Sequence, residues 1–383
     1  MVSGQNHPLT CTRHGLVVGN YCHDVLIRDD VVVAETLGGA SSFISAVLDG
    51  LSVPYTLVAK VGRDFAYSTS RDPIAVPTSK TTLFHAHFDS EVDADAHSDR
   101  VLRRVRACEP IRPSDLPSSR YEFGMAVGVG GEILPETLEK MIEVCDAVFV
   151  DIQALIRVFD DVDGTVKLVG LEDSGFFHLL PRIRFLKASV EEVLIMDIEE
   201  VRKLCCVVVT NGKHGCTVYW KDGEVQIGPF PTNQIDPTGA GDSFLGGFAS
   251  GLFQGLAVTD AALLGNFFGS LTVSQIGLPK FDFRLLQRVK DEVQRRKMQS
   301  ISCHERQDEN SKFMKQAGHE QFHASLAAAK LMPASPVPEC QRDVPTSPRA
   351  VEQQSILPQC TGQSKLLINY VYDEPFQTVD GKP

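Results

Sequence analysis

The chain has 383 residues, of which 43% are hydrophobic and 22% charged, as in a large globular α/β domain with an appendage. Its net charge of -12 argues against a non-specific nucleic-acid-binding protein, whose affinity comes from a basic surface. No apolar run reaches the length of about 18 residues that a membrane span needs, and no signal-peptide core precedes the first strand. Ten irregularly spaced cysteines without a Cys-x-x-Cys pair indicate free thiols, so we expect a protein of the reducing cytoplasm.

Short β-rich runs alternate with helical patterns along the chain, which predicts βαβ units around a mainly parallel sheet. The expected strands are Leu16 to Gly19, Thr56 to Val61, Ala147 to Ile152, Ile183 to Leu186 and Cys206 to Thr210. The expected helices are Ser41 to Leu51, Leu134 to Val144, Glu191 to Leu204, Asp242 to Phe253, Thr259 to Ile276 and Asp282 to Arg296. An Asp-Gly pair predicts the turn of a hairpin within residues 216–227.

Other segments stand apart from this alternation. Residues near 22–37 and 80–90 carry alternating β-branched residues that are not linked to long helices. The locally basic stretch Arg100 to Arg112 fits a solvated amphipathic face better than an anion site. From about residue 299 the periodicity fades and Gln, Ser, Pro and Glu accumulate, which predicts a domain over residues 1–298 and a disordered tail over 299–383. The apolar island Leu366 to Val371 in that tail fits a docking fragment, or no role, better than a partner-binding motif.

The most informative stretch, residues 236–249, reads Asp-Pro-Thr-Gly-Ala-Gly-Asp-Ser-Phe-Leu-Gly-Gly-Phe-Ala. Gly239, Ala240 and Gly241 let successive backbone N–H groups point into one concavity that binds an anion. The apolar residues that follow recur at helical spacing, so the loop opens a buried helix whose N-terminus also favours negative charge. Asp242 beside this anion hole suits a general base acting on an alcohol. A glycine-rich helix entry with a capping Asp is the alternative, but chance produces these four residues together with Asp236 only about once in a million windows.

This stretch resembles the C-terminal signature of the pfkB (ribokinase-like) carbohydrate kinases, which transfer the γ-phosphoryl group of ATP to a sugar-like hydroxyl. The resemblance, which spans roughly residues 15 to 297, implies an α/β fold. In that fold a three-layer sandwich surrounds a central, mainly parallel sheet, and the strands near 22–37 and 80–90 form a small β lid. It also implies Asp242 as catalytic base, an anion hole at Gly239, Ala240 and Gly241, and a need for ATP and Mg²⁺, with K⁺ left open.

The family's N-terminal signature is matched by Gly38 and Gly39, at the entry to a helix, and by the later run Val61-Gly62-Arg63-Asp64. A glycine pair lets the backbone come close to a small polyhydroxylated ligand and donate N–H groups to its oxygens. The resemblance implies that Asp24 accepts hydrogen bonds from two substrate hydroxyls, with a surface-loop Asp as the alternative.

Gln153 is a further candidate for binding a substrate hydroxyl. It follows the strand that ends near Asp151, and ligands of open α/β sheets bind at the carboxyl ends of the strands. Phe43 stands where many sugar-kinase relatives carry a hydroxyl-binding Asn. Because an apolar ring leaves a sugar hydroxyl unpaired, Phe43 argues against ribose and fructose as substrates.

Other matches concern the nucleotide. Ser189 and Glu192 resemble the family's Asn-x-x-Glu motif with Ser in place of Asn, which implies that Ser189 lies at the ATP site and Glu192 organises magnesium-bound water. Glu192 equally fits an acidic residue in the first turn of a helix. Asn266 matches the lining of the adenine pocket, and a polar residue on a partly exposed helix is an equal alternative. The strand and loop beside the ATP phosphates are matched by Thr210, Gly212 and Gly215.

Within the family, the likeness is greatest to the branch that phosphorylates myo-inositol at its 3-position, a reaction that leads towards phytate. The segments that carry this likeness are 150–157, 185–189, 205–210 and 264–269. The expected partners are therefore a small polyol and ATP, with neither nucleic acid nor membrane, and the oligomeric state stays open. A kinase of another sugar or nucleoside, and a catalytically silent regulatory protein of the same fold, are the alternatives. The chain has neither a P-loop nor a complete dinucleotide fingerprint.

Overall fold

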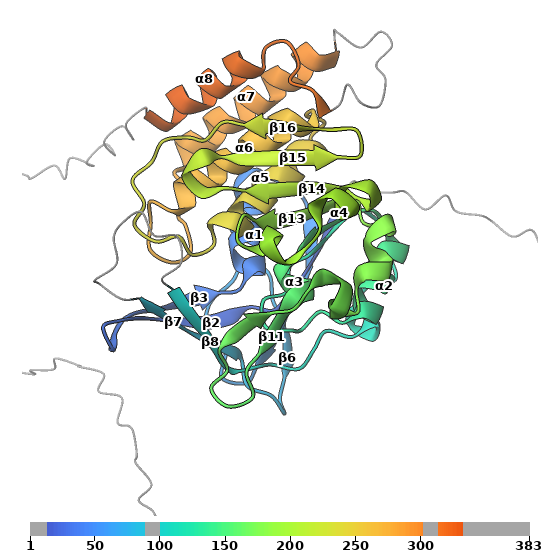
Figure 1. Ribbon diagram of the computed structural model, residues 1–383. Coiled ribbons are helices and arrows are strands. Elements are labelled where there is room, and N and C mark those ends of the chain that lie inside the picture. The colour runs from blue at the N-terminus through green and yellow to red at the C-terminus, as the bar shows by residue number, and fades with distance from the viewer. Residues whose placement is uncertain (1–13, 89–99, 302–312, 332–383) are drawn as a thin grey trace, which may run out of the picture. The chain divides into compact units, whose positions relative to one another are not determined.

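The computed structural model describes residues 14–88, 100–301 and 313–331. An eight-stranded sheet forms the centre, in the order β16-β15-β14-β13-β10-β9-β1-β4. Figure 1 labels its strands β13 to β16. Its strands are β1 Gly15–Val18, β4 Tyr55–Val58, β9 Tyr121–Ala126, β10 Cys145–Asp151, β13 Phe185–Ser189, β14 Cys206–Thr210, β15 Cys216–Trp220 and β16 Gly223–Ile227. All neighbours from β4 to β14 pair in parallel, and the hairpin β15–β16 adds the antiparallel edge. The predicted mainly parallel sheet is confirmed.

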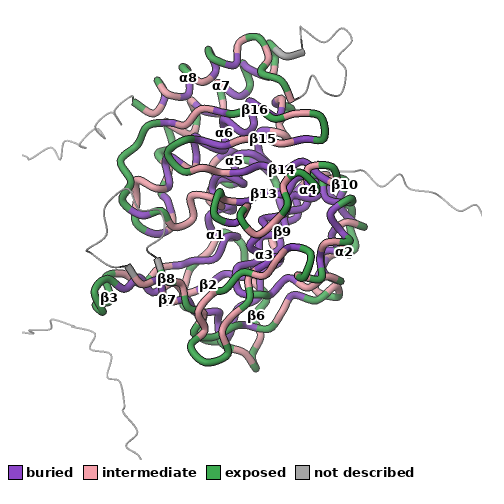
Figure 2. Tube along the Cα trace, viewed as in Figure 1, coloured by how far each residue is buried: buried purple, intermediate pink, exposed green. Residues whose placement is uncertain are grey.

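Helices cover both faces of this sheet. One face packs against α1 Ala40–Gly50, α5 Ala240–Phe253, α6 Val258–Thr272, α7 Phe283–Ile301 and α8 His319–Leu331. The other face packs against α2 Pro135–Val144, α3 Gln153–Ile156 and α4 Ile198–Leu204. Alternate residues of β1 enter the two cores, Val17 on one side and Leu16 and Val18 on the other. Because both faces are covered, the central strands are almost continuously apolar, and Figure 2 shows them as buried.

A separate four-stranded sheet, in the order β3-β2-β7-β8, includes the segments near 22–37 and 80–90. Its strands are β2 Cys22–Arg28, β3 Val31–Gly38, β7 Thr82–Phe88 and β8 Arg100–Arg106. The basic stretch therefore begins as an edge strand, in which Val101 and Val105 are exposed while Leu102 lines a cavity described below. The tip of β3 is exposed as well (Figure 2).

Short elements complete the described chain. The remaining strands are β5 Lys60–Gly62, β6 Ile74–Val76, β11 Arg157–Phe159 and β12 Val166–Leu168. The 3-10 turns are η1 Pro113–Asp115, η2 Leu171–Ser174, η3 Phe177–Arg182, η4 Glu192–Ile195 and η5 Gly212–His214. In this part of the chain, no helix has the length and apolar character needed to cross a membrane.

Two central elements differ from the sequence prediction. Strand β9 was not predicted, because its sequence Tyr-Glu-Phe-Gly-Met-Ala has no β-branched residue and contains Glu and Gly. Its Gly124 is required by packing, since a Cβ there would lie 2.6 Å from the Sγ of Cys145. The helix expected from Glu191 to Leu204 is divided into η4 and α4, because Asp197 caps α4 by accepting hydrogen bonds from the backbone N–H groups of Glu199 and Glu200.

Helix α8 lies in the region for which a disordered tail was expected, so that expectation is wrong for residues 319–331. Phe322 and Leu326 of α8 are buried, and α8 packs on α6 and α7 (Figure 1). Asp260 of α6 binds Arg296 Nε over 2.7 Å and His319 Nδ1 over 2.6 Å, all three side chains being buried. The prediction missed this short apolar face because the region as a whole is polar in composition. Residues 332–383, with the island at 366–371, lie outside the described residues.

Candidate active site

The candidate site lies where the carboxyl ends of β10 and β13 meet the N-terminus of α5 and the inner face of the small sheet. A cavity of about 70 Å³ opens there. The expected site residues that line this cavity are Asp24, Gly39, Gln153, Gly239 and Asp242. The topology thus brings together side chains from the small sheet, from α3 and from α5, which lie far apart in the sequence. Carboxyl ends of parallel strands are the usual place for ligands in such sheets.

The loop before α5 packs with its backbone at Gly239 closely against the ring of Phe43. Gly239 is the N-cap residue of α5 with φ +75°, and a Cβ at this position would overlap the ring of Phe43. Ala240 begins the helix, and Asp242 lies in its first turn. Gly239, Ala240 and Gly241 thus stand at a helix N-terminus, whose dipole favours an anion. The backbone N–H of Ala240 donates to the carbonyl of Pro237 over 3.3 Å.

The carboxylate of Asp242 is half-buried and accepts a hydrogen bond from Gln153 Nε2 over 3.2 Å. Burial raises the pKa of Asp242 above the ordinary value, and the cations of Lys187 and Arg157 act in the opposite direction. A carboxylate with a raised pKa that is still ionised near neutral pH is a better general base than an exposed one.

Lys187 is a site residue that sequence reasoning did not assign a role. Its ammonium group is buried, lies 3.0 Å from Asp151 Oδ2, and would lie 2.8 Å from a Cβ added at Gly241. Burial alone would lower the pKa of Lys187, but the carboxylates of Asp151, Glu192 and Asp242 raise it, so the group stays charged. A buried cation therefore lies directly beside the proposed anion hole. A lysine between the apolar residues Leu186 and Ala188 of this buried strand was the signal in the sequence.

The glycine pair at the start of α1 makes room for Asp24. A Cβ on Gly38 would overlap the carboxylate of Asp24, whose strand β2 pairs with β3. Gly39 is the N-cap residue of α1 and lines the cavity. Packing against the carboxylate of Asp24 therefore explains why residue 38 is a glycine.

Ser189 and Glu192 form a reciprocal pair of hydrogen bonds at the end of β13. The backbone N–H of Ser189 donates to Glu192 Oε2 over 2.8 Å, and the backbone N–H of Glu192 donates to Ser189 Oγ over 3.2 Å. This is a capping box, which fits the alternative of an acidic residue in a first helical turn. Glu192 is nevertheless buried and acts electrostatically on Lys187 and Asp151. Asp151, Lys187, Glu192 and Asp242 together form the charged cluster beside α5.

The other expected nucleotide residues lie beyond this cluster. Thr210 pairs with Ser189 in the sheet and donates its hydroxyl to the carbonyl of Ala188 over 3.3 Å. Gly212 begins η5, and Gly215 follows this turn with φ +88°. Asn266 does not reach Asp242 through any hydrogen bond of the described residues, because its amide donates to the carbonyls of Ile227 and Gly228.

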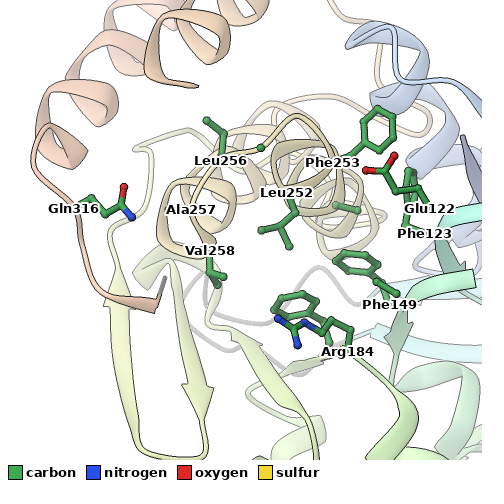
Figure 3. A pocket seen from close by; sticks show the side chains of 14 residues that line it. Glu122, Phe123, Phe149, Arg184, Leu252, Phe253, Leu256, Ala257, Val258 and Gln316 are labelled. Atoms are coloured by element: carbon green, nitrogen blue, oxygen red, sulfur yellow. The ribbon is translucent and has the colours of Figure 1, made fainter. Parts of the chain in front are cut away.

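A second and larger cavity, of about 380 Å³, lies at the opposite ends of the same strands (Figure 3). Phe123, Phe149, Leu252 and Phe253 line it together with Arg184, and none of the expected site residues does. Size alone therefore does not identify the site; the convergence of carboxylates and cations at the smaller cavity does.

Comparison with known proteins agrees with this geometry. Residues 181–280 match the family model described as pfkB family carbohydrate kinase. The chain is 62% identical to an inositol 3-kinase of Arabidopsis thaliana over 83% of this chain and 88% of that protein. It is 52% identical to an inositol 3-kinase of Oryza sativa subsp. japonica over 83% of this chain and 82% of that protein. In fold it is similar to a pyrophosphate-dependent kinase of the ribokinase family complexed with a pyrophosphate analog and myo-inositol, with TM-score 0.59, 16% identity, and coverage of 70% and 97% of the two chains.

Proposed function

The chain belongs to the pfkB family of carbohydrate kinases, and from this premise we propose that it is an ATP-dependent inositol 3-kinase. It transfers the γ-phosphoryl group to a hydroxyl of myo-inositol, giving inositol 3-phosphate for the synthesis of inositol phosphates and phytate. The observation that carries the proposal is the position of Asp242, at the N-terminus of α5 and at the wall of a small cavity that Asp24, Gln153 and Arg157 also line. The relatives from Arabidopsis thaliana and Oryza sativa subsp. japonica are named inositol 3-kinases.

Asp242 takes the proton from the attacking hydroxyl in the proposed reaction. The Gln153 amide orients its carboxylate, and burial keeps its basicity above that of an exposed Asp. Phosphoryl transfer has a loose transition state, so positioning and charge stabilisation outweigh covalent chemistry. The N–H groups of Gly239, Ala240 and Gly241 and the ammonium of Lys187 are suited to stabilise the negative charge on the transferred group.

The charged cluster fits a magnesium ion held mainly by phosphate and water. Among the described residues, no group of three His, Cys, Asp or Glu side chains could hold a metal directly. Mg²⁺ keeps several waters and is commonly bound through substrate phosphates with one or two carboxylates. Glu192 is the carboxylate that we assign to such a water, since one of its oxygens caps Ser189 and its charge acts on the cluster. The bound ion would neutralise charge on the phosphates, and K⁺ is a second ion to test.

Asp24, Gly39 and Gln153 are assigned to the polyol, and Ser189, Thr210, Gly212, Gly215 and Asn266 to ATP. Asp24 accepts hydrogen bonds from ring hydroxyls beside the one that reacts. Phe43 closes one side of the cavity with an apolar ring, which suits a cyclic polyol carrying C–H groups on its faces. We place the enzyme in the cytoplasm, in accordance with its free cysteines.

A coupled assay that follows ADP production tests the proposal. The purified protein is given ATP, Mg²⁺ and a panel of myo-inositol, ribose, fructose and a nucleoside, with and without K⁺, and specificity is ranked by kcat/KM. Pyrophosphate serves as a second donor, followed through release of inorganic phosphate. We expect myo-inositol with ATP to rank first and the product to be the 3-phosphate by NMR. Higher kcat/KM for another acceptor, or no turnover at all, would contradict the proposal.

A further inference from the structure

Arg157 is a cation in the substrate cavity that neither the sequence motifs nor the proposed mechanism uses. It begins β11 directly after α3, and its backbone N–H caps α3 by donating to the carbonyl of Gln153. Its side chain is half-buried and lines the cavity together with Asp24, Gln153 and Asp242. In residues 14–88, 100–301 and 313–331, the guanidinium forms no hydrogen bond or ion pair. An arginine without a protein partner at the wall of a cavity is available to a ligand.

Among the side chains that line this cavity, Arg157 is the charged hydrogen-bond donor, whereas the other side-chain donors, Thr238 and Gln153, are neutral. Ionised Asp24 and Asp242 only accept hydrogen bonds. The amide of Gln153 already donates to Asp242 Oδ1. Each hydroxyl of a polyol, however, both donates a proton and offers lone pairs that need a donor. The guanidinium of Arg157 has five N–H donors in a fixed plane, which suits two neighbouring oxygens on one ring.

We propose that Arg157 is a substrate-binding residue that donates hydrogen bonds to ring oxygens of a neutral cyclic polyol beside the hydroxyl that reacts. This inference rests on the proposed function and deepens it. Two neighbouring hydroxyls of the polyol donate hydrogen bonds to Asp24 or Asp242. The oxygens of the same hydroxyls accept hydrogen bonds from Arg157. A ring that lacks one of these hydroxyls leaves buried charge unpaired and is bound poorly.

The charges of the cavity favour a neutral substrate over an anionic one. Asp24 and Asp242 contribute two negative charges, and Arg157 contributes one positive charge. Lys187 also acts on Asp242, but its charge is offset by Asp151, with which its ammonium pairs. A sugar phosphate or sugar acid would therefore meet net negative charge, whereas inositol brings none. Arg157 also lowers the pKa of Asp242 against the effect of burial, so its cation acts on the proposed base.

The test compares Arg157→Ala, Arg157→Lys and wild type, using the full chain with ATP and Mg²⁺. For Arg157→Ala we expect kcat/KM for myo-inositol to fall about 10- to 100-fold while the KM for ATP is unchanged. Arg157→Lys should recover part of this loss. The acid limb of the kcat/KM profile should move to higher pH in Arg157→Ala and stay near its wild-type position in Arg157→Lys. Arg184→Ala, which removes an exposed arginine far from this cavity, is the matched control and should behave as wild type.

A set of monodeoxy-inositols separates substrate binding from a merely structural role. At the ring position that Arg157 contacts, removal of the hydroxyl should lower kcat/KM of wild type but have little effect on Arg157→Ala. If Arg157→Ala loses activity equally on every analogue, or if wild type prefers a sugar phosphate or a sugar acid, the inference is overturned while a kinase activity stands. Absence of inositol turnover in wild type overturns both the inference and the proposed function.

Discussion

The side-chain amide of Gln153 donates a hydrogen bond to the carboxylate of Asp242 over 3.2 Å, although 89 positions separate the two residues. The sequence motifs assigned Gln153 to the substrate and Asp242 to the proton transfer. Their contact joins the two roles, because an amide that fixes the carboxylate also fixes the direction in which it accepts a proton. The same amide nitrogen has a second N–H, and both residues line the same cavity.

Replacing Asp242 by Asn should lower turnover by roughly 100-fold or more, because the amide cannot take the proton of the attacking hydroxyl. The substitution preserves size, so we expect the fold and the affinity for ATP to be retained, as measured by circular dichroism and calorimetric titration. Asp146→Asn, at an exposed carboxylate paired with Arg120, is the control and should leave turnover unchanged. Near-wild-type turnover in Asp242→Asn would remove Asp242 from the mechanism.

The pH dependence of kcat/KM should show an acid limb above the ordinary range of an Asp side chain, about 3.9. Burial raises the pKa of Asp242, so on lowering the pH its carboxylate takes up a proton earlier than an exposed Asp would. Activity is then present above this raised pKa and is lost as the pH falls through it. Circular dichroism over the same range checks that the fold persists. A plateau in kcat/KM that extends to about pH 4 would speak against an ionised Asp242 as the base.

Gly239→Val should lower both activity and stability. A branched side chain would overlap the ring of Phe43, and the φ of +75° is strained for any residue with a Cβ. We expect kcat/KM for ATP to fall at least about tenfold, because the loop must shift away from the phosphates. Gly239→Ala should lower the melting temperature less in a Phe43→Ala background than in wild type, because the overlap with the ring is then absent. Unchanged ATP affinity and rate in Gly239→Val would count against the anion hole at this loop.

Lys187→Met should destabilise the fold as well as abolish activity. It leaves the buried carboxylate of Asp151 without its cation, which costs about 3–5 kcal/mol in the free energy of unfolding. Adding Asp151→Asn removes the unpaired charge and should restore much of that stability, measured by urea denaturation. Turnover should stay low in the double variant, because no cation remains beside Gly241. If turnover returns with stability, Lys187 has only a structural role.

Helix α8 should contribute measurably to the stability of the domain. Leu326 is fully buried, and Leu326→Ala is expected to lower the free energy of unfolding by about 2–5 kcal/mol. Leu331→Ala changes the same residue type on the same helix at 82% exposure and should have almost no effect. Denaturant titration of both variants decides the matter. Equal stability of the two variants would mean that α8 is not part of the folded core.

Much of the fold could be predicted because its signals are local. Apolar strands between helical patterns gave the parallel sheet, and the Asp-Gly turn gave the hairpin β15–β16. Strand β9 could not be predicted, since Gly124 and Glu122 lower its β propensity and only its place between β1 and β10 makes it a strand. Helix α8 escaped prediction for a similar reason, because its apolar face becomes visible only against α6 and α7.

Some residues of the candidate site could likewise be predicted from the sequence, and others could not. The role of the run Gly239 to Asp242 could be predicted from the sequence, because few other structures need that spacing of small and acidic residues. The roles of Lys187 and Arg157 could not, since a single cation in a strand or after a short helix has many uses. Only the fold shows that both cations act on Asp242, Lys187 beside the loop of α5 and Arg157 at the wall of the substrate cavity.

The buried group of Asp260, Arg296 and His319 has a consequence for folding during synthesis of the chain. Asp260 precedes His319 by 59 positions, so α6 leaves the ribosome well before the histidine that completes its environment. Until then, the carboxylate and the apolar surface that α8 covers remain open to solvent. The last turns of the described chain therefore close the core, and nascent chains that end before residue 319 should be bound by chaperones more than longer ones.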